Sequence, residues 1–310
     1  MDSAAPSDPP KSDAGLPPVQ PPSGRFIAQL FVIPGLIILV LVLVILAANF
    51  LVNRDQDPAH FLQRLDSENA DIRWRAANDL AQVLKRGEPA TLRWKADPGF
   101  ALDLAERLDR AFQVLVEDEK LLGARIAKST DKDRHLQWRK LRSQRDHVSF
   151  LAAALGEFHI AAGAPVLCEL LKHDNSPDLN GNTQQRRMTL WALMNLGENL
   201  KGYAKIPSEQ QSAVVVTLKD AATGKTSRAG WARTALHYID KSNVSSRDMP
   251  FVVKVDEHLI ATAKADDQFL RKLTAMSFNF WGELGAVEGA LVDLSNDKGR
   301  GTLVRVEEND

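Results

Sequence analysis

The chain has 310 residues, of which 44% are apolar and 25% are charged, and its formal net charge is -1. This length and apolar content are sufficient for a sizeable buried core, and the small net charge excludes a global electrostatic attraction to nucleic acid or anionic lipid. Cys168 is the only cysteine, so an intramolecular disulfide is excluded and cysteine usage does not indicate the redox compartment.

Residues 1–25 contain seven of the 15 prolines, mixed with Ser, Asp and Ala, and almost no large apolar side chain. Such a segment buries too little apolar surface to offset the entropy that it loses on ordering. We therefore predict a disordered, proline-rich head over residues 1–25. A simple tether is the favoured role, although Pro17-Pro18 and Pro21-Pro22 also suit a proline-rich recognition ligand.

Residues 26–52 form the most apolar stretch of the chain, and no charged residue occurs from Phe31 to Ala48. A soluble amphipathic helix shows a polar stripe, which is missing here. At about 1.5 Å per residue, a helix over 26–52 is long enough to cross a hydrocarbon core of roughly 30 Å. We predict a transmembrane helix over 26–52 that lies in the lipid bilayer. A cleavable signal peptide is the alternative, but its apolar region is normally shorter, and Leu46-Ala47-Ala48 matches a cleavage site poorly.

The charges that flank this segment give a weak orientation signal. Lys11, Arg25 and the amino terminus precede it, whereas Arg54 and Arg64 follow it within the distance that matters. The small positive excess before the segment favours a cytoplasmic head. We therefore expect a single-pass protein of the plasma or inner membrane, with its soluble domain on the extracytoplasmic side.

A spacing of 41 to 43 residues recurs in the rest of the chain. Arginines open a series of amphipathic stretches, and small or apolar side chains follow each arginine at three, four and seven residues, as one helical face requires. These repeat arginines are Arg73, Arg145, Arg186, Arg228 and Arg271. The last three gaps are 41, 42 and 43 residues, whereas the first gap is 72 residues and equals one period plus an insertion of about 30.

A candidate first helix precedes each arginine stretch, and turn residues separate the two. These first helices are expected at 59–65, 101–115, 164–173, 209–222 and 256–265. Helix pairs with a period of about 40–47 residues are typical of HEAT and armadillo repeats. The stretch PAHFLQRLDSENADIRWRAANDLAQVL and the block ending TSRAGWARTALHYI resemble the HEAT repeat family. The resemblance implies an all-α fold, an α-solenoid of about five helix pairs. An irregular helical bundle with an accidental period is the alternative.

This interpretation divides the soluble part into four segments. First helical repeats are expected over 55–116, a charged helical insertion over 117–146, further helical repeats over 147–285, and a C-terminal cap and tail over 286–310. In HEAT-like repeats the second-helix arginine bonds to neighbouring carboxylates or carbonyls. The resemblance therefore implies that the five repeat arginines are structural.

The insertion carries a cationic cluster. Arg134, Trp138, Arg139, Lys140 and Arg142 lie in a stretch without any acidic residue. Clustered cations beside an aromatic ring suit phosphates, either of lipid headgroups or of nucleic acid. Acidic residues just upstream are available as ion-pair partners, however, and a solvated helical hairpin is the favoured interpretation. We keep the cluster as a candidate interaction patch and expect no nucleic-acid partner.

Motifs for chemistry are scarce. No hydrolase elbow, P-loop, zinc-protease helix or dinucleotide fingerprint occurs. Four histidines that lie near one another in sequence are too widely spaced for a helical metal pair at i and i+4; they are His135, His147, His159 and His173.

The loop that begins at Ser176 resembles a calcium loop, because Asp178, Asn180 and Gly181 follow at the expected spacing. Its twelfth position is Arg187 instead of a bidentate Glu, and a cation there repels the ion. A polar turn between helices explains the same residues. We therefore predict no metal site, no cofactor and no catalytic residue.

The predicted function is a membrane-anchored, non-enzymatic scaffold for protein–protein interaction, and the sequence does not identify the partners. Fold alone does not establish this role, so two alternatives stay open. The first is a membrane-anchored hydrolase or lyase that uses His147 or His159 beside carboxylates. The second is a module that contacts lipid headgroups or nucleic acid through the basic region 134–145.

Overall fold

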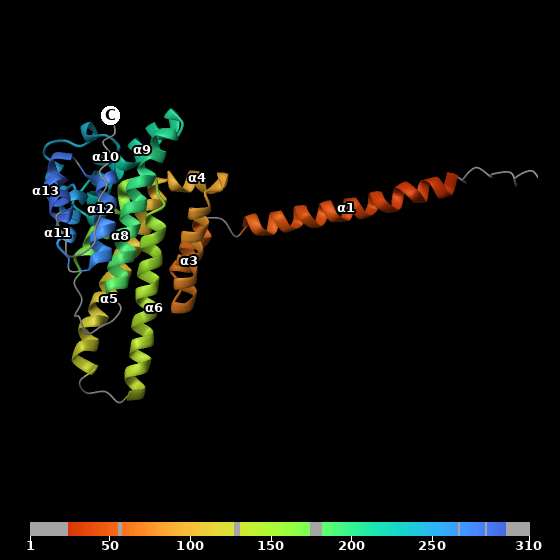
Figure 1. Cartoon of the computed structure of the whole chain (residues 1–310). Helices are drawn as coiled ribbons and strands as arrows, with labels where there is room; N and C mark the ends of the chain where they lie inside the picture. Colours follow the sequence, from red (N-terminus) through yellow and green to blue (C-terminus); the bar gives the residue numbers. More distant parts are fainter. Residues whose placement is uncertain are drawn as a thin grey trace, which may run out of the picture. The chain divides into compact units, whose positions relative to one another are not determined.

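The computed structural model of the chain describes residues 24–54, 58–126, 131–173, 182–265, 267–282 and 284–295. Over these ranges the chain forms thirteen α-helices and four short 3-10 helices, and no β-strand (Figure 1). The prediction of an all-α fold is confirmed. The chain divides into two compact units, Met1–Gln56 and Asp57–Asp310, which are described separately below.

The first unit contains helix α1 (Gly24–Arg54), with Pro34 inside it. Between Phe31 and Leu46, where the side chains of α1 are described, every large apolar side chain is 44–71% exposed. No helix in the described residues combines the length and the hydropathy that a membrane crossing requires, so the transmembrane segment 26–52 stays a prediction. Residues 1–23 of the predicted head lie outside the described residues.

In the second unit, first helices and arginine helices follow one another in the order that the 41–43-residue period predicts. The five expected first helices correspond to α2, α5, α7, α9 and α11, and the five repeat arginines lie in α3, α6, α8, α10 and α12. The bounds are α2 (Pro58–Leu65), α3 (Ala70–Arg86), α4 (Pro89–Lys95), α5 (Pro98–Ile126), α6 (Asp131–Leu155), η1 (Ala161–Gly163), α7 (Ala164–Lys172), α8 (Asn182–Asn199), η2 (Leu200–Lys205), α9 (Ser208–Ala221), α10 (Ser227–Ile239), η3 (Lys241–Asn243), η4 (Met249–Phe251), α11 (Val255–Ala263), α12 (Gln268–Trp281) and α13 (Leu284–Ser295).

The first and last arginine helices begin in the same way. The side chain of Asn69 accepts a hydrogen bond from a backbone N–H of the first turn of α3, and Asp267 does the same for α12. Four residues after each cap, an arginine reaches back to the turn before it. Arg73 Nη1 donates to the carbonyl of Ser67 at 2.7 Å, and Arg271 Nη1 donates to that of Ala265 at 2.8 Å. In both helices the acceptor lies two residues before the cap.

The arginine helices pack on one another to form one layer of the unit. Helix α3 packs on α6, α6 on α8 and α8 on α12 (Figure 1). We call these four helices the row. Helices α2, α5, α7 and α11 each pack on their row partner, and they contact one another in the same order. The core lies between the two layers, where leucines such as Leu80, Leu104, Leu151 and Leu167 are fully buried.

The pair α9–α10 departs from this order. If the pairs stacked in the order of the chain, α10 would separate α8 from α12. Helix α12 instead packs directly on α8, while α10 packs on η1, α7 and α5. Arg228 of α10 adds polar contacts to this packing, since its Nη1 donates to Asp103 Oδ1 of α5 at 2.7 Å and to Glu106 Oε2 at 3.3 Å.

Helices α5 and α6 form a hairpin that extends beyond the other helices of the unit (Figure 1). The predicted insertion 117–146 covers the end of α5 and the start of α6, so it lengthens two repeat helices instead of adding a separate element. Its turn, residues 127–130, lies outside the described residues. The predicted C-terminal cap and tail, 286–310, comprises most of α13 and residues 296–310, which also lie outside them.

Glycines allow the row helices to approach closely. A Cβ added at Gly156, after α6, would lie 2.8 Å from the carbonyl oxygen of Ala192 in α8. A Cβ at Gly197 of α8 would lie 2.5 Å from Trp281 Nε1 of α12. The same indole N–H donates to the carbonyl of Leu193 at 2.7 Å in a buried position. Contact of α8 with α12 therefore requires a residue without a side chain at position 197.

We predict that Gly197→Ala lowers the free energy of unfolding by about 1–3 kcal/mol, because the added methyl group overpacks the contact with Trp281. Gly289→Ala in α13 is the matched control, since nothing lies within 4 Å of its added Cβ. The control should raise helix stability by about 0.5–1 kcal/mol. Denaturation followed by circular dichroism measures both variants, and equal effects at the two glycines would contradict the prediction.

Candidate interaction surface

The predicted basic patch lies on the part of α6 that faces solvent. Arg139, Lys140 and Arg142 are exposed, whereas Trp138 is half-buried and packs against the core. Lys140 Nζ lies 3.1 Å from Asp118 Oδ2 of α5, in an ion pair whose lysine side chain is 69% exposed. The side chain of Arg134 lies outside the described residues. Asp118 thus neutralises one cation of the patch, and the exposed arginines at 139 and 142 remain on the same helix as Trp138.

A buried ionic cluster lies next to the patch. Arg145 Nε and Nη2 donate to Glu119 Oε1 at 3.0 and 2.8 Å, and His173 Nε2 lies 3.0 Å from Glu119 Oε2. Burial alone raises the pKa of Glu119, but the hydrogen bonds of His173 and Arg145 outweigh it and hold that pKa below its ordinary value. The ring of His173 also meets Phe112 edge-on at 5.2 Å. The cluster ties α5, α6 and α7 together.

The repeat arginines have partners of two kinds. Arg73 and Arg271 donate hydrogen bonds to backbone carbonyls, whereas Arg145 and Arg228 form ion pairs with carboxylates of α5. Arg186 is half-buried on α8. Two of these contacts, those of Arg145 and Arg228, join separate helices, and the structural role that the HEAT resemblance implies for all five arginines stays a prediction.

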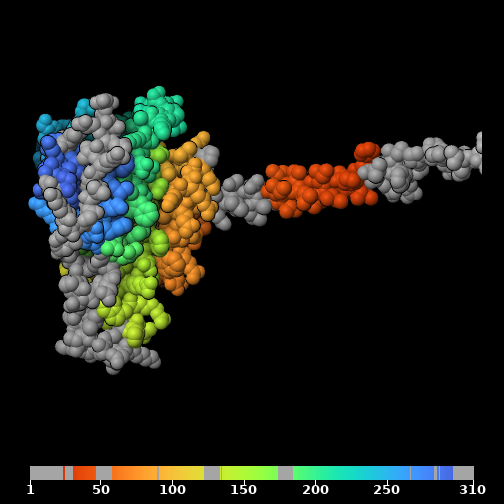
Figure 2. Space-filling view, viewed as in Figure 1, coloured from red at the N-terminus to blue at the C-terminus, as the bar shows by residue number. Residues whose placement is uncertain are grey.

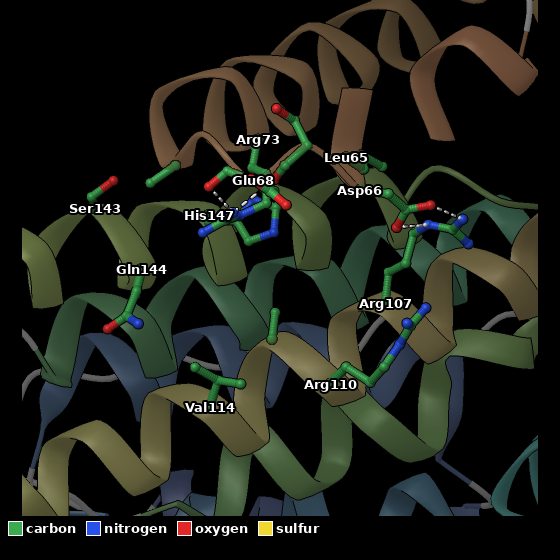
Figure 3. Close-up of a pocket in the computed structure, with 13 residues that line it drawn as sticks. Leu65, Asp66, Glu68, Arg73, Arg107, Arg110, Val114, Ser143, Gln144 and His147 are labelled. Carbon is green, nitrogen blue, oxygen red and sulfur yellow. Dashed lines mark hydrogen bonds and ion pairs between the residues drawn. The ribbon is translucent and has the colours of Figure 1, made fainter. Parts of the chain in front are cut away.

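His147 lines a cavity of about 320 Å³ between the α2–α3 turn, α5 and α6 (Figure 3). One side of this cavity is closed by Arg107, which donates from Nη2 to Asp66 Oδ2 at 2.6 Å. Burial, together with the charge of Arg73, lowers the pKa of His147 to about 4. His159 lies elsewhere, with its Nδ1 at 2.9 Å from the carbonyl of Asn199. In the described part of the chain neither histidine is hydrogen-bonded to a carboxylate.

The calcium-like loop runs from 176 to 187, of which residues 176–181 lie outside the described residues and residues 182–187 belong to α8. Arg187, which ends it, donates to Asp267 Oδ2 of α12 at 2.7 Å, and its guanidinium lies 5.0 Å from the ring centroid of Phe269. Cys168 is fully buried in α7, and burial raises the pKa of its thiol. Among the side chains that the structure describes, no three His, Cys, Asp or Glu residues are grouped to hold a metal ion.

The outer surface of the row exposes large apolar side chains. Trp191 of α8 is 43% exposed, and Phe269 and Met276 of α12 are 49% and 45% exposed. Lys85 of α3 lies 5.5 Å from the ring centroid of Trp191, so a cation lies beside this exposed ring. Figure 2 shows the adjoining surfaces of α3, α6 and α8. We call the face formed by Lys85, Phe150, Met188, Trp191, Phe269 and Met276 the row surface.

Two hollows lie between the row helices. A hollow of about 170 Å³ separates α3, α6 and α8, and its lining includes Lys85, Phe150, Met188 and Trp191. A second hollow of about 400 Å³ lies between α6 and α8 and is lined partly by Trp138, Arg142 and Gln185. The patch residues Trp138 and Arg142 therefore belong to the same layer as the row surface.

The sequence analysis missed the row surface, although the repeat period contains a signal for it. The residue five positions after each row arginine is Asn78, Phe150, Trp191 or Met276. Position five lies away from the buried positions three, four and seven on a helix. Apolar side chains at three of four such positions indicate an apolar stripe on the side of the row that faces away from the core.

Comparisons with known proteins give no family. No protein-family model matches the chain, and no curated protein is similar to it. One similar solved structure is described as a crystal structure of an engineered protein from the Northeast Structural Genomics Consortium, with 17% identity, 78% of this chain and 90% of that chain covered, and a TM-score of 0.29.

We predict that exchanging Arg139, Lys140 and Arg142 for Glu changes the free energy of unfolding by less than about 1 kcal/mol, because exposed ion pairs contribute little. Arg145→Ala should cost about 3–5 kcal/mol, since it leaves the buried carboxylate of Glu119 without its main cation. Urea denaturation compares the two variants. A large loss from the triple exchange would show that the exposed patch is part of the framework.

Proposed function

We propose that this protein is a membrane-anchored, non-enzymatic scaffold that binds another protein through the row surface. The observation that carries the proposal is the line of half-exposed apolar side chains along the row, flanked by Lys85 and Arg187. Soluble proteins seldom leave such residues side by side without a partner. Trp, Phe, Met and Arg are also the residue types that are enriched in the centres of protein interfaces.

We infer that the soluble unit is a HEAT-like α-solenoid in which the pair α9–α10 is displaced. Two layers of helices in the same order support this, together with the matching caps and arginines of α3 and α12. In such stacks each pair buries its apolar face on its neighbours and leaves one extended surface for binding. The row would be that surface.

We propose further that α1 anchors the scaffold as a single transmembrane helix over residues 26–52. Its support is the uncharged sequence from Phe31 to Ala48 and the exposure of all the large apolar side chains described there. Burial of these side chains in lipid removes their contact with water. The protein would then be a single-pass protein of the plasma or inner membrane, with the row surface on the extracytoplasmic side.

The anchor has a direct test. Deletion of residues 26–52 should move the protein from alkali-washed membranes to the soluble fraction, because the apolar helix is the source of membrane attachment. Deletion of residues 1–23 is the control and should leave the protein in the membrane fraction. Retention in washed membranes without 26–52 would overturn the anchor.

We predict that the double variant Trp191→Ala and Met276→Ala lowers the recovery of the protein partner at least about tenfold, because truncation of each anchor residue typically costs more than 1 kcal/mol of binding free energy. Crosslinking and affinity capture of the full chain in its own membranes, followed by mass spectrometry, measures partner recovery. Val216→Ala is the control, since Val216 is 58% exposed on α9, away from the row. Equal recovery with all variants would contradict binding through the row surface.

A further inference from the structure

The hollow between α6 and α8 contains polar groups that the packing of the protein does not use. Its volume is about 400 Å³, and its lining includes Trp138, Arg142, Asp146 and Ser149 of α6 and Gln185 of α8. This volume lies in the range of sites that bind small ligands or a few residues of a peptide.

Gln185 is the unusual member of this lining. It is only 4% exposed, yet neither its Oε1 nor its Nε2 has a hydrogen-bond partner in the structure of the described residues. Burial of an unpartnered amide costs free energy, and native proteins retain few such groups. A side chain of this kind in the wall of a hollow indicates that a ligand supplies the missing hydrogen bonds.

A primary amide offers a donor and an acceptor in one plane. In an extended chain the N–H and the C=O of one residue point to the same side, which is why paired strands exchange two hydrogen bonds per residue pair. One backbone residue of an extended segment therefore satisfies both atoms of Gln185. A phosphate or a carboxylate offers acceptors alone and would leave Oε1 unpaired.

The charges around the amide specify a side chain of the ligand. Arg142 is exposed, and its guanidinium has no ion-pair or hydrogen-bond partner in the described part of the chain. The neighbouring Arg145 is already bonded to Glu119. Asp146, one turn after Arg142, is an exposed acid in the same lining. One cation is thus available for a carboxylate, and the nearby acid disfavours a run of several acidic side chains.

We propose that the hollow between α6 and α8 binds an extended peptide segment of a protein partner, with Gln185 hydrogen-bonded to its backbone and Arg142 paired with one acidic side chain. The inference rests on the proposed scaffold function and specifies the kind of segment that the scaffold holds. The half-buried ring of Trp138 provides an apolar wall beside the segment.

The probe is a displayed library of random 12-residue peptides, selected on the full-length protein in detergent. Enriched peptides should share one Asp or Glu at a fixed position without a run of acids. Arg142→Ala and Gln185→Met should each weaken the binding of these peptides by at least about tenfold, because each variant removes a charge-assisted or buried hydrogen bond. Lys219→Ala removes an exposed cation of α9 that does not line the hollow, and this variant should bind them like the original chain.

Two further measurements separate recognition from folding. Gln185→Met should weaken peptide binding but keep or raise the thermal unfolding midpoint. The midpoint does not fall because Met fills the same space without unpaired polar atoms. Arg142→Glu should recover binding when the shared acid of the peptide is exchanged for Lys. Absence of enriched peptides, absence of a shared acid, or equal binding by the Gln185 and Arg142 variants would each overturn the inference. Peptides that depend on Trp191 but not on Gln185 would overturn it and leave the scaffold proposal standing.

Discussion

The close approach of α8 to its two neighbours is the constraint on which the rest of the soluble unit depends. Gly156 and Gly197 let backbone and ring atoms of α6, α8 and α12 come into contact, and the buried bond from Trp281 to the carbonyl of Leu193 fixes that distance. Because α12 occupies the place beside α8, the α9–α10 pair packs on α5, α7 and η1 instead. The same contact brings Trp191, Phe269 and Met276 into one surface.

Charge in this unit is used in two different ways. The buried carboxylate of Glu119 is shared by Arg145 and His173, so it joins three helices and leaves little charge for a ligand. The exposed arginines at 139 and 142 lie on the same helix but outside that cluster. One basic stretch thus contributes both to the framework and to the face that the proposed partner would contact, which explains why its sequence supports both interpretations.

Local regularities of the sequence were sufficient to predict the ten helices of the five pairs, but not α4. The apolar positions three, four and seven residues after each arginine gave five second helices, and the turn residues before them gave the first helices. The displacement of α10 was not predicted, because it rests on contacts between distant parts of the chain, such as the packing of α10 on α5 and α7 and the bond from Arg228 to Asp103. The exposed residues at position five were within reach of the same reasoning. The unpaired amide of Gln185 was not, since only the packed structure identifies which polar atoms lack partners.

The contact between α8 and α12 joins parts of the chain that are far apart, since the bond from Trp281 to Leu193 closes a loop of 88 residues. Closing a long loop costs entropy before any contact compensates for it, and contacts between distant residues slow folding. During synthesis, α3, α6 and α8 can associate as soon as they emerge, but the end of the row must wait for α12. The full row surface is therefore a property of the finished chain, and a nascent or truncated chain presents only its first part.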